Sequence, residues 1–241
     1  MTVRAVAFDL DYTLAVPERD RQTLLDEATE AVGAPAMSRE AYLDAHVGHL
    51  TRETREPIFE RLLDEHGTAR GNGGAGARED GTSDGADPAG DADPAALARA
   101  YRERVSGALR PVPGVEAMLE GLRAEYRVGL LTNGPTVAQR DKLVALGWTD
   151  AFDVALVTGD LEAGKPDPAS FEALLDALGS RPDETVFVGD DVEADVGGAA
   201  GVGIHPVQVT FPGSAAPDAR AVAHLDRDRL ASELPPLVAS L

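Results

Sequence analysis

Two aspartates stand close together at the end of a short apolar segment, and their spacing suits chemistry on a single ligand. Asp9 closes the segment 3–9 (VRAVAFD), and Asp11 follows two residues later. Side chains two residues apart in an extended chain face the same way, so both carboxylates can reach one ligand. An Asp carboxylate can accept a phosphoryl group as a nucleophile. A second Asp beside it can protonate a leaving alkoxide and later activate water, so the pair favours phosphoryl transfer.

Other polar side chains follow apolar segments further along the chain and can join this pair. They are Thr132, Asn133, Asp190, Asp191 and, in a connecting loop, Lys165. Asp9, Asp11 and Asp190 together would bring about three negative charges to one place, where they would repel each other without a cation. Carboxylate oxygens suit Mg²⁺, so we expect magnesium as the cofactor. Magnesium and Lys165 would then attract a dianionic phosphate.

Segments typical of strands alternate with segments typical of helices from residue 111 onward. This alternation predicts a parallel sheet with helices on both faces, which the strand ending at Asp9 must join. We therefore expect an α/β fold with a doubly wound core formed by residues 1–16 and 111–241. Residues 17–110 would form a small all-helical domain inserted into this core. Ligands of open parallel sheets bind at the carboxyl ends of the strands, where the polar side chains stand.

Apolar periodicity and the positions of Gly, Pro and Asp predict the individual elements. The predicted strands are residues 3–9, 127–132, 152–158, 185–190 and 203–209. The predicted helices are residues 20–32, 39–50, 55–66, 93–109, 114–125, 135–146, 167–179, 192–200 and 226–239. Residues 67–93 are rich in Gly, Asp and Ala and almost free of large apolar side chains, which predicts a flexible loop.

Four segments resemble the motifs of the haloacid dehalogenase (HAD) superfamily. FDLDYTL at 8–14 resembles motif I, LLTNG at 130–134 resembles motif II, GKPDPASFEALLDALG at 164–179 resembles motif III, and VGDDVEAD at 188–195 resembles motif IV. The four occur in the family's order and strand context, and together they span about residues 3–200. The resemblance implies a Rossmann-like core, and it implies that the helical insertion between motifs I and II is a cap that closes over the substrate.

The resemblance also implies a role for each acidic residue of the first and last motifs. Asp9 would be the nucleophile and a magnesium ligand. Asp11 would be the general acid and base, with its backbone carbonyl on the metal, and Asp190 would bind magnesium directly. Family members that dehalogenate haloacids or cleave phosphonates lack an acid at the position of Asp11. Its presence therefore implies a phosphate ester as the substrate.

Further matched residues would surround the phosphate and the metal. Thr132 would hydrogen-bond the phosphoryl oxygens, with the backbone of Asn133 assisting. Lys165 would hold the nucleophile and the phosphate in register. Asp195 would act on the metal through water or orient Lys165. Asp191 would lie in the outer shell of the metal or at the surface.

These roles predict a Mg²⁺-dependent phosphatase that hydrolyses a small-molecule phosphomonoester through an aspartyl-phosphate intermediate. Phosphoglycolate, sugar phosphates and nucleotides are all consistent with a helical cap. Two alternatives stay open, namely a phosphomutase of the same superfamily and a non-catalytic regulatory protein with the HAD fold. Phosphomutases also keep the second Asp, whereas a non-catalytic protein has no need of the five motif residues.

The charge of the chain bears on its partners and its environment. It has 42 Asp and Glu residues against 22 Lys and Arg residues, a formal net charge of −20. Such a charge repels nucleic acids and anionic membranes, so we expect a small phosphorylated metabolite as the partner. Halophiles use self-repulsion of this kind, and the chain has only two lysines, which favours a salt-adapted protein from a halophile.

The remaining expectations concern location, oligomeric state and three side chains. The N-terminal segment does not resemble a signal peptide, and no segment approaches the ~18 apolar residues of a membrane helix. We therefore expect a cytoplasmic protein, either a monomer or a homodimer. His46 and His49 share one face of a predicted helix, where they would contact the cap core or the substrate. Lys142 lies in the middle of a predicted helix and is expected on a solvated face.

Overall fold

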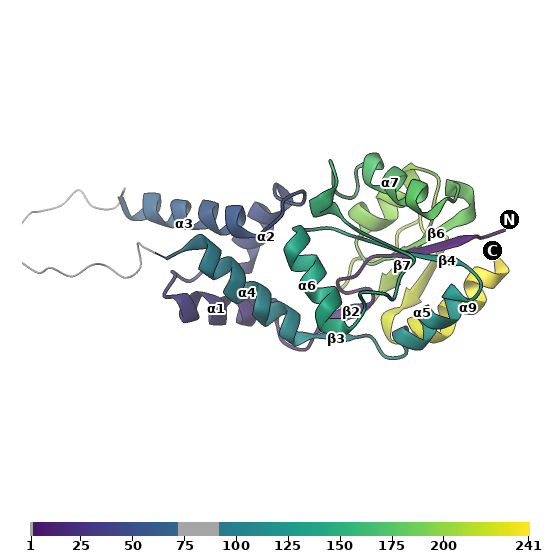
Figure 1. Cartoon of the computed structure of the whole chain (residues 1–241), viewed down its shortest axis with the longest axis horizontal. Helices are drawn as coiled ribbons and strands as arrows, with labels where there is room; N and C mark the ends of the chain where they lie inside the picture. Colours follow the sequence, from purple (N-terminus) through teal and green to yellow (C-terminus); the bar gives the residue numbers. More distant parts are fainter. Residues whose placement is uncertain (1, 72–91) are drawn as a thin grey trace, which may run out of the picture. The chain divides into compact units, whose positions relative to one another are not determined.

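The structure is a computed structural model in which residues 2–71 and 92–241 are described. The chain forms two units, each with its own hydrophobic core (Figure 1). The first, here called the sheet unit, comprises Met1–Glu18, Leu50–Glu53 and Leu109–Leu241, and the second, here called the helical unit, comprises Arg19–His49 and Thr54–Ala108. Within the described part of the chain, no helix is both long enough and apolar enough to cross a membrane.

A six-stranded parallel sheet forms the centre of the sheet unit (Figure 1). Its strands are β1 (Ala5–Phe8), β4 (Arg127–Thr132), β5 (Val154–Val157), β6 (Thr185–Gly189), β7 (His205–Thr210) and β8 (Ala223–Asp226). The spatial order is β5-β4-β1-β6-β7-β8, and all neighbours run parallel. The chain moves outward from β1 through β4 and β5, and then crosses to the other side of β1 for β6, β7 and β8. The strand order therefore reverses beside β1, which is the position where sheets of this type bind ligands.

Helices cover both faces of this sheet (Figure 1). They are α5 (Val115–Arg123), α6 (Thr136–Leu146), α7 (Pro168–Leu178), a π-helical turn (Val192–Gly197), α8 (Gly198–Gly201) and α9 (Leu230–Ser240). Val6 and Phe8 of β1 belong to the apolar cluster with α5 and α9, whereas Ala5 and Ala7 belong to the opposite cluster with α7. All four side chains are fully buried, which explains why this strand is apolar without alternation.

The parallel, doubly wound α/β core predicted from the sequence is confirmed, and each predicted strand corresponds to one of β1, β4, β5, β6 or β7. β8, the edge strand of the sheet, was not predicted from the sequence. Nor were β2 (Ala15–Pro17) and β3 (Leu109–Pro111), which pair antiparallel close to the ends of two segments of the sheet unit, at Glu18 and Leu109. The predicted helix 192–200 is instead a π-helical turn followed by α8.

The described residues of the helical unit form four helices. They are α1 (Arg21–Val32), α2 (Arg39–Val47), α3 (Glu56–Gly71) and α4 (Pro94–Ala108). Its core contains the buried aromatic rings of Tyr42, Phe59 and Tyr101, which contact one another at centroid distances of 5.1 to 5.9 Å. Residues 67–71 continue α3, so the prediction of a loop was wrong for them. Residues 72–91 of that predicted loop lie outside the described residues.

Candidate active site

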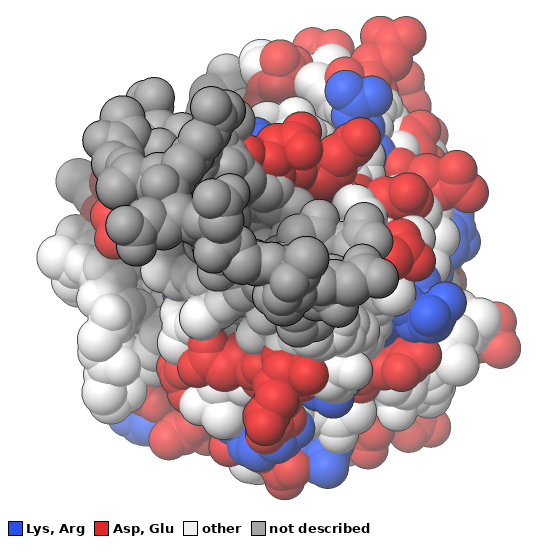
Figure 2. Space-filling view, turned by 90° about the vertical axis from the view of Figure 1, so that its left-hand side faces the viewer, with Lys and Arg blue, Asp and Glu red and all other residues white. Residues whose placement is uncertain are grey.

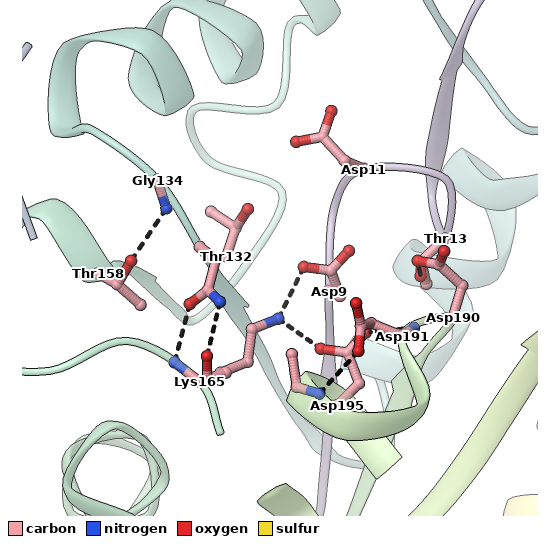
Figure 3. Close-up of polar contacts among 12 residues, drawn as sticks. Asp9, Asp11, Thr13, Thr132, Gly134, Thr158, Lys165, Asp190, Asp191 and Asp195 are labelled. Atoms are coloured by element: carbon pink, nitrogen blue, oxygen red, sulfur yellow. Dashed lines mark hydrogen bonds and ion pairs between the residues drawn. The ribbon is translucent and has the colours of Figure 1, made fainter. Parts of the chain in front are cut away.

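Three carboxylates meet at the carboxyl end of the sheet, where the strand order reverses (Figure 3). Asp9 follows β1, Asp190 follows β6, and Asp195 lies in the π-helical turn. One oxygen of each carboxylate lies within 4.8 Å of the others. The pairing of β1 with β6 extends to Asp9, because the Asp9 N–H donates to the carbonyl of Val188 at 2.9 Å. The structure therefore brings together Asp9 and Asp190, as the sheet topology predicts, and adds Asp195 to them.

Lys165 lies between two of these carboxylates (Figure 3). Its Nζ donates to Asp9 Oδ1 and to Asp195 Oδ1, each at 2.7 Å, and the side chain is buried. The Asn133 side chain fixes the backbone of Lys165. Asn133 Nδ2 donates to the Lys165 carbonyl, and Asn133 Oδ1 accepts from the Lys165 N–H, both at 2.9 Å. Asn133 thus ties the loop of Lys165 to the end of β4, whereas the sequence analysis had considered only the Asn133 backbone.

The pKa values in this cluster reflect an excess of buried negative charge. Burial raises the pKa of Asp9 to about 7, because the attraction to Lys165 only partly offsets desolvation and the repulsion from Asp195. Burial, together with the charges of Asp9 and Asp195, raises the pKa of Asp190 to about 8. Burial alone would lower the pKa of Lys165, but the charges of Asp195 and Asp9 outweigh this effect and hold that pKa above its usual value. One ammonium group does not balance three carboxylates.

The donor set of the cluster fits a magnesium ion. Carboxylate oxygens are the hard ligands that Mg²⁺ prefers, and a divalent cation would supply the positive charge that the cluster lacks. Asp190 is oriented by Thr13, whose Oγ1 donates to Asp190 Oδ1 at 3.1 Å, a contact that the sequence analysis missed. Among the described residues, Asp9, Asp190 and Asp195 are the acidic or histidine side chains that lie close enough together to share a cation.

Asp191 acts as a helix cap beside this cluster. Its Oδ1 accepts from the backbone N–H groups of Glu193 at 2.9 Å and Ala194 at 2.7 Å, at the start of the π-helical turn. Its own N–H donates to Asp195 Oδ2 at 3.0 Å, which helps to orient Asp195. Gly189 leaves room for this arrangement, because a Cβ there would lie 2.3 Å from Asp195 Oδ2. The Asp191 carboxylate therefore organises the turn that carries Asp195.

Asp11 stands apart from the three clustered carboxylates, and its side chain points away from Lys165 (Figure 3). Two side chains of α6 contact it. Gln139 Nε2 donates to Asp11 Oδ2 at 3.1 Å and to the buried Thr132 Oγ1 at 2.5 Å. Lys142 Nζ donates to the same oxygen of Asp11. The structure thus connects the predicted general acid to the predicted phosphate ligand Thr132.

The prediction that Lys142 lies on a solvated face is wrong. Its side chain is 3% exposed, because the face of α6 that carries Lys142 and Gln139 is turned toward Asp11 rather than toward water. Two features of the sequence could have drawn attention to this pair, although neither shows that it is buried. The two residues are three apart in a helix and so share a face. Lys142 is also one of only two lysines in the chain.

His46 and His49 lie in the helical unit and contact its own residues. The His46 ring stacks on Tyr42 with centroids 5.7 Å apart, and His49 Nδ1 lies 2.7 Å from the carbonyl of Ala45. Both contacts belong to the packing of α2 within the helical unit, one of the two roles that the sequence analysis considered.

Comparison with known proteins places this site in a family context. A family model described as haloacid dehalogenase-like hydrolase matches residues 3–203. Phosphoserine phosphatase of Thermus thermophilus is 42% identical over 98 residues, which cover 40% of this chain and 39% of that protein. N-acylneuraminate-9-phosphatase of Rattus norvegicus is 41% identical over 90 residues, which cover 37% of this chain and 36% of that protein. The match thus spans less than half the length of these curated relatives.

A solved structure is similar over nearly all of the chain. The HAD phosphatase from Thermococcus onnurineus aligns with a TM-score of 0.62 and 27% identity, and the alignment covers 96% of this chain and 98% of that chain. The similarity in structure therefore extends well beyond the segments that align with the curated relatives by sequence.

Proposed function

The chain belongs to the haloacid dehalogenase-like hydrolase family, and from this premise we propose that it is a Mg²⁺-dependent phosphatase with an aspartyl-phosphate intermediate on Asp9. The observation that carries the proposal is the contact network around Lys165. A buried ammonium group bridges Asp9 and Asp195 at 2.7 Å each, and Asp190 lies in the same cluster. A nucleophilic carboxylate is thereby fixed beside groups that attract a phosphate.

We propose that Asp9, Asp190 and the backbone carbonyl of Asp11 hold the magnesium ion, with Asp195 acting mainly on Lys165. The ion would neutralise the phosphate charge and that of the carboxylates when bound. The raised pKa values of Asp9 and Asp190 support this assignment, since both carboxylates need added positive charge to stay ionised at neutral pH.

The proposed reaction has two halves, each with one bond formed and one broken at phosphorus. In the first, an Asp9 carboxylate oxygen attacks phosphorus, the ester P–O bond breaks, and Asp11 gives its proton to the leaving alkoxide. In the second, water attacks the phosphorus of the aspartyl phosphate while Asp11 takes a proton from this water. The bond between phosphorus and the Asp9 oxygen breaks, which releases phosphate and restores the Asp9 carboxylate. Lys165 and Thr132 would hold the phosphoryl oxygens during both halves.

The substrate class we propose is a small phosphomonoester. The two curated relatives described above are named as phosphatases of phosphoserine and of an N-acylneuraminate 9-phosphate, which are small phosphate esters of different chemistry. Retention of Asp11 supports an ester whose leaving alkoxide needs a proton. We also propose that the protein works at high salt, which the net charge of −20 supports.

The proposal is tested by measuring phosphate release from a panel of small phosphomonoesters with Mg²⁺ and with excess chelator. We expect release that depends on Mg²⁺, and we expect Asp9→Asn to reduce it below detection because the amide cannot accept the phosphoryl group. Asp183→Asn, which changes an exposed Asp in the same way, should leave the rate unchanged. If the wild-type protein released no phosphate from any ester, the proposal would be wrong. An isomerised sugar phosphate without free phosphate would identify a phosphomutase instead.

A further inference from the structure

Two buried donors on one face of α6 contact the carboxylate of Asp11. Gln139 is 1% exposed and Lys142 is 3% exposed, and both donate to Asp11 Oδ2. A buried lysine is uncommon, because its charge must be compensated, and here the compensation includes the carboxylate of the proposed general acid. This pairing calls for an explanation beyond the packing of a helix.

The hydrogen-bond chemistry fixes which group donates in each contact. Lysine can only donate, and an ionised carboxylate can only accept, so the Lys142 contact defines Asp11 Oδ2 as an acceptor. Gln139 must then also turn its NH₂ group, rather than its carbonyl, toward this oxygen. The same NH₂ group donates to Thr132 Oγ1 at 2.5 Å. Both hydrogens of the Gln139 amide are therefore used, one toward Asp11 and one toward Thr132.

This arrangement has consequences for both acceptors. Asp11 Oδ2 accepts from two N–H groups, so a proton carried by this carboxyl group belongs on Oδ1, the other oxygen. Thr132 Oγ1 accepts from Gln139, so its own hydrogen points elsewhere and can be donated to a phosphoryl oxygen. A single pair of α6 side chains thus sets the direction in which the acid delivers its proton and the direction in which the hydroxyl donates.

We propose that Lys142 and Gln139 are positioning residues for the proposed phosphatase reaction. Lys142 holds the Asp11 carboxyl group so that Oδ1 faces the leaving oxygen, and Gln139 couples this orientation to that of the Thr132 hydroxyl. The inference rests on the proposed function, since it assigns a role within that reaction. The competing explanation is that Lys142 and Gln139 only stabilise the fold at this position.

The two explanations differ in how a mutation depends on the leaving group. Phenyl phosphate and p-nitrophenyl phosphate have nearly the same shape, but phenoxide needs a proton to leave readily and nitrophenolate does not. The ratio kcat/KM reports the steps up to departure of the phenol, so a loss that is greater on phenyl phosphate than on p-nitrophenyl phosphate reflects the transfer of the proton from Asp11. We compare the two values of kcat/KM in Mg²⁺ for the full chain and its Lys142→Met and Gln139→Met variants.

We expect both variants to lose at least about tenfold more kcat/KM on phenyl phosphate than on p-nitrophenyl phosphate, as part of the 10²- to 10⁴-fold that general acid catalysis supplies. Gln139→Met should also raise KM for both esters, because the Thr132 hydroxyl is no longer oriented. Arg140→Met is the matched control. It removes an exposed cation from the same helix, where Arg140 pairs with Asp160 at 2.7 Å, and it should change neither ester.

A double variant separates positioning from stability. In an Asp11→Asn background, Lys142→Met should cause no further loss on phenyl phosphate, because its effect acts through the acid that has been removed. Equal losses on both esters, no loss on either, or a full additional loss in the Asp11→Asn background would overturn the inference. A wild-type protein inactive on both esters and on the whole panel of phosphomonoesters would instead contradict the proposed function itself. Urea unfolding of each variant shows whether it is folded. If Lys142→Met does not fold, the Gln139→Met variant still tests the inference.

Discussion

At the scale of single residues, the site is a buried cluster in which the carboxylates outnumber the ammonium groups. Lys165 Nζ contacts Asp9 and Asp195, whereas the side-chain donor to Asp190 among the described residues is the neutral Thr13 hydroxyl. Burial raises the pKa of Asp9 to about 7 and that of Asp190 to about 8, both far above an ordinary carboxyl group, because these contacts do not offset the loss of hydration. These two residues are therefore where proton binding and metal binding compete.

This competition predicts how Mg²⁺ binding depends on pH. Without metal, the folded protein keeps protons on Asp9 and Asp190 that the unfolded chain has already released above about pH 4, so the contribution of these two groups to the free energy of unfolding falls as pH rises to about 8. Mg²⁺ needs the ionised carboxylates, so its affinity should increase over the same range. We expect a larger Mg²⁺-induced gain at pH 8 than at pH 6, approaching about 2.7 kcal/mol at a free concentration of about 100 Kd.

Urea unfolding with and without Mg²⁺ at the two pH values measures this gain. Asp190→Asn should remove most of it, whereas the exposed control Asp183→Asn should keep it. A gain that is independent of pH, or larger at pH 6, would mean that these carboxylates do not bind the ion.

At the scale of elements, the close approach of α8 to α7 decides where Lys165 and Asp195 can meet. Lys165 lies in the loop before α7, and Asp195 lies in the π-helical turn before α8. A Cβ added to Gly198 at the start of α8 would lie 2.4 Å from Phe171 of α7 and 3.0 Å from the Cα of Pro166. Only glycine permits this approach.

We therefore predict that Gly198→Ala destabilises the protein by about 1–3 kcal/mol, the usual cost of forcing extra volume into a packed core. Gly201→Ala is the matched control in the same helix, because a Cβ there meets nothing within 4 Å. It should be neutral or stabilising by up to about 1 kcal/mol, since alanine favours a helix over glycine. Urea unfolding of both variants measures the two changes in free energy. Equal effects on stability would show that the contact between α8 and α7 does not require glycine at position 198.

The central strands could be predicted from the sequence because their burial leaves a clear pattern. β1, β4 and β6 are buried almost throughout, which produces uninterrupted apolar segments that end in polar residues. β8 has the sequence AHLD, with only Leu225 buried, because it forms the edge of the sheet and needs a single apolar contact. β2 and β3 have three residues each, too few for any periodicity to appear.

The candidate site could be predicted from the sequence only where its residues follow a recognisable strand. Asp9 and Asp190 stand at strand ends, and the topology of a parallel sheet brings such positions together. Lys142 could not be located in this way, since its partner Asp11 lies 131 residues away in the chain. A mid-helix lysine is solvated in most proteins, and only the structure shows that α6 turns this face inward. The partners of Thr13 and Gln139 were missed for the same reason.

At the scale of the whole molecule, the main feature is the net charge of −20. Figure 2 shows that Asp and Glu side chains are more abundant than Lys and Arg side chains over the part of this face that is coloured. Many of the cations that are present already pair with acidic groups, such as Arg220 with Asp218 and Glu193. The unbalanced charges repel one another, and salt screens this repulsion.

We predict that the Tm rises between dilute buffer and molar KCl. Sucrose at matched osmolarity serves as the control, because it favours compact states without screening charge. A larger rise in KCl than in sucrose would support salt adaptation through electrostatic screening. An unchanged Tm, or an equal rise in both, would contradict it.

A covalent bond between Asp9 and phosphate is the central step of the proposed mechanism, and mass spectrometry can detect it directly. The Asp11→Asn variant, mixed with p-nitrophenyl phosphate and Mg²⁺ and quenched in acid, should accumulate the intermediate, because its hydrolysis lacks the general base. We predict that one phosphoryl group is added to the protein and that fragmentation places it on Asp9. Release of nitrophenol without any phosphorylated protein, or a phosphoryl group on another residue, would contradict the proposed mechanism.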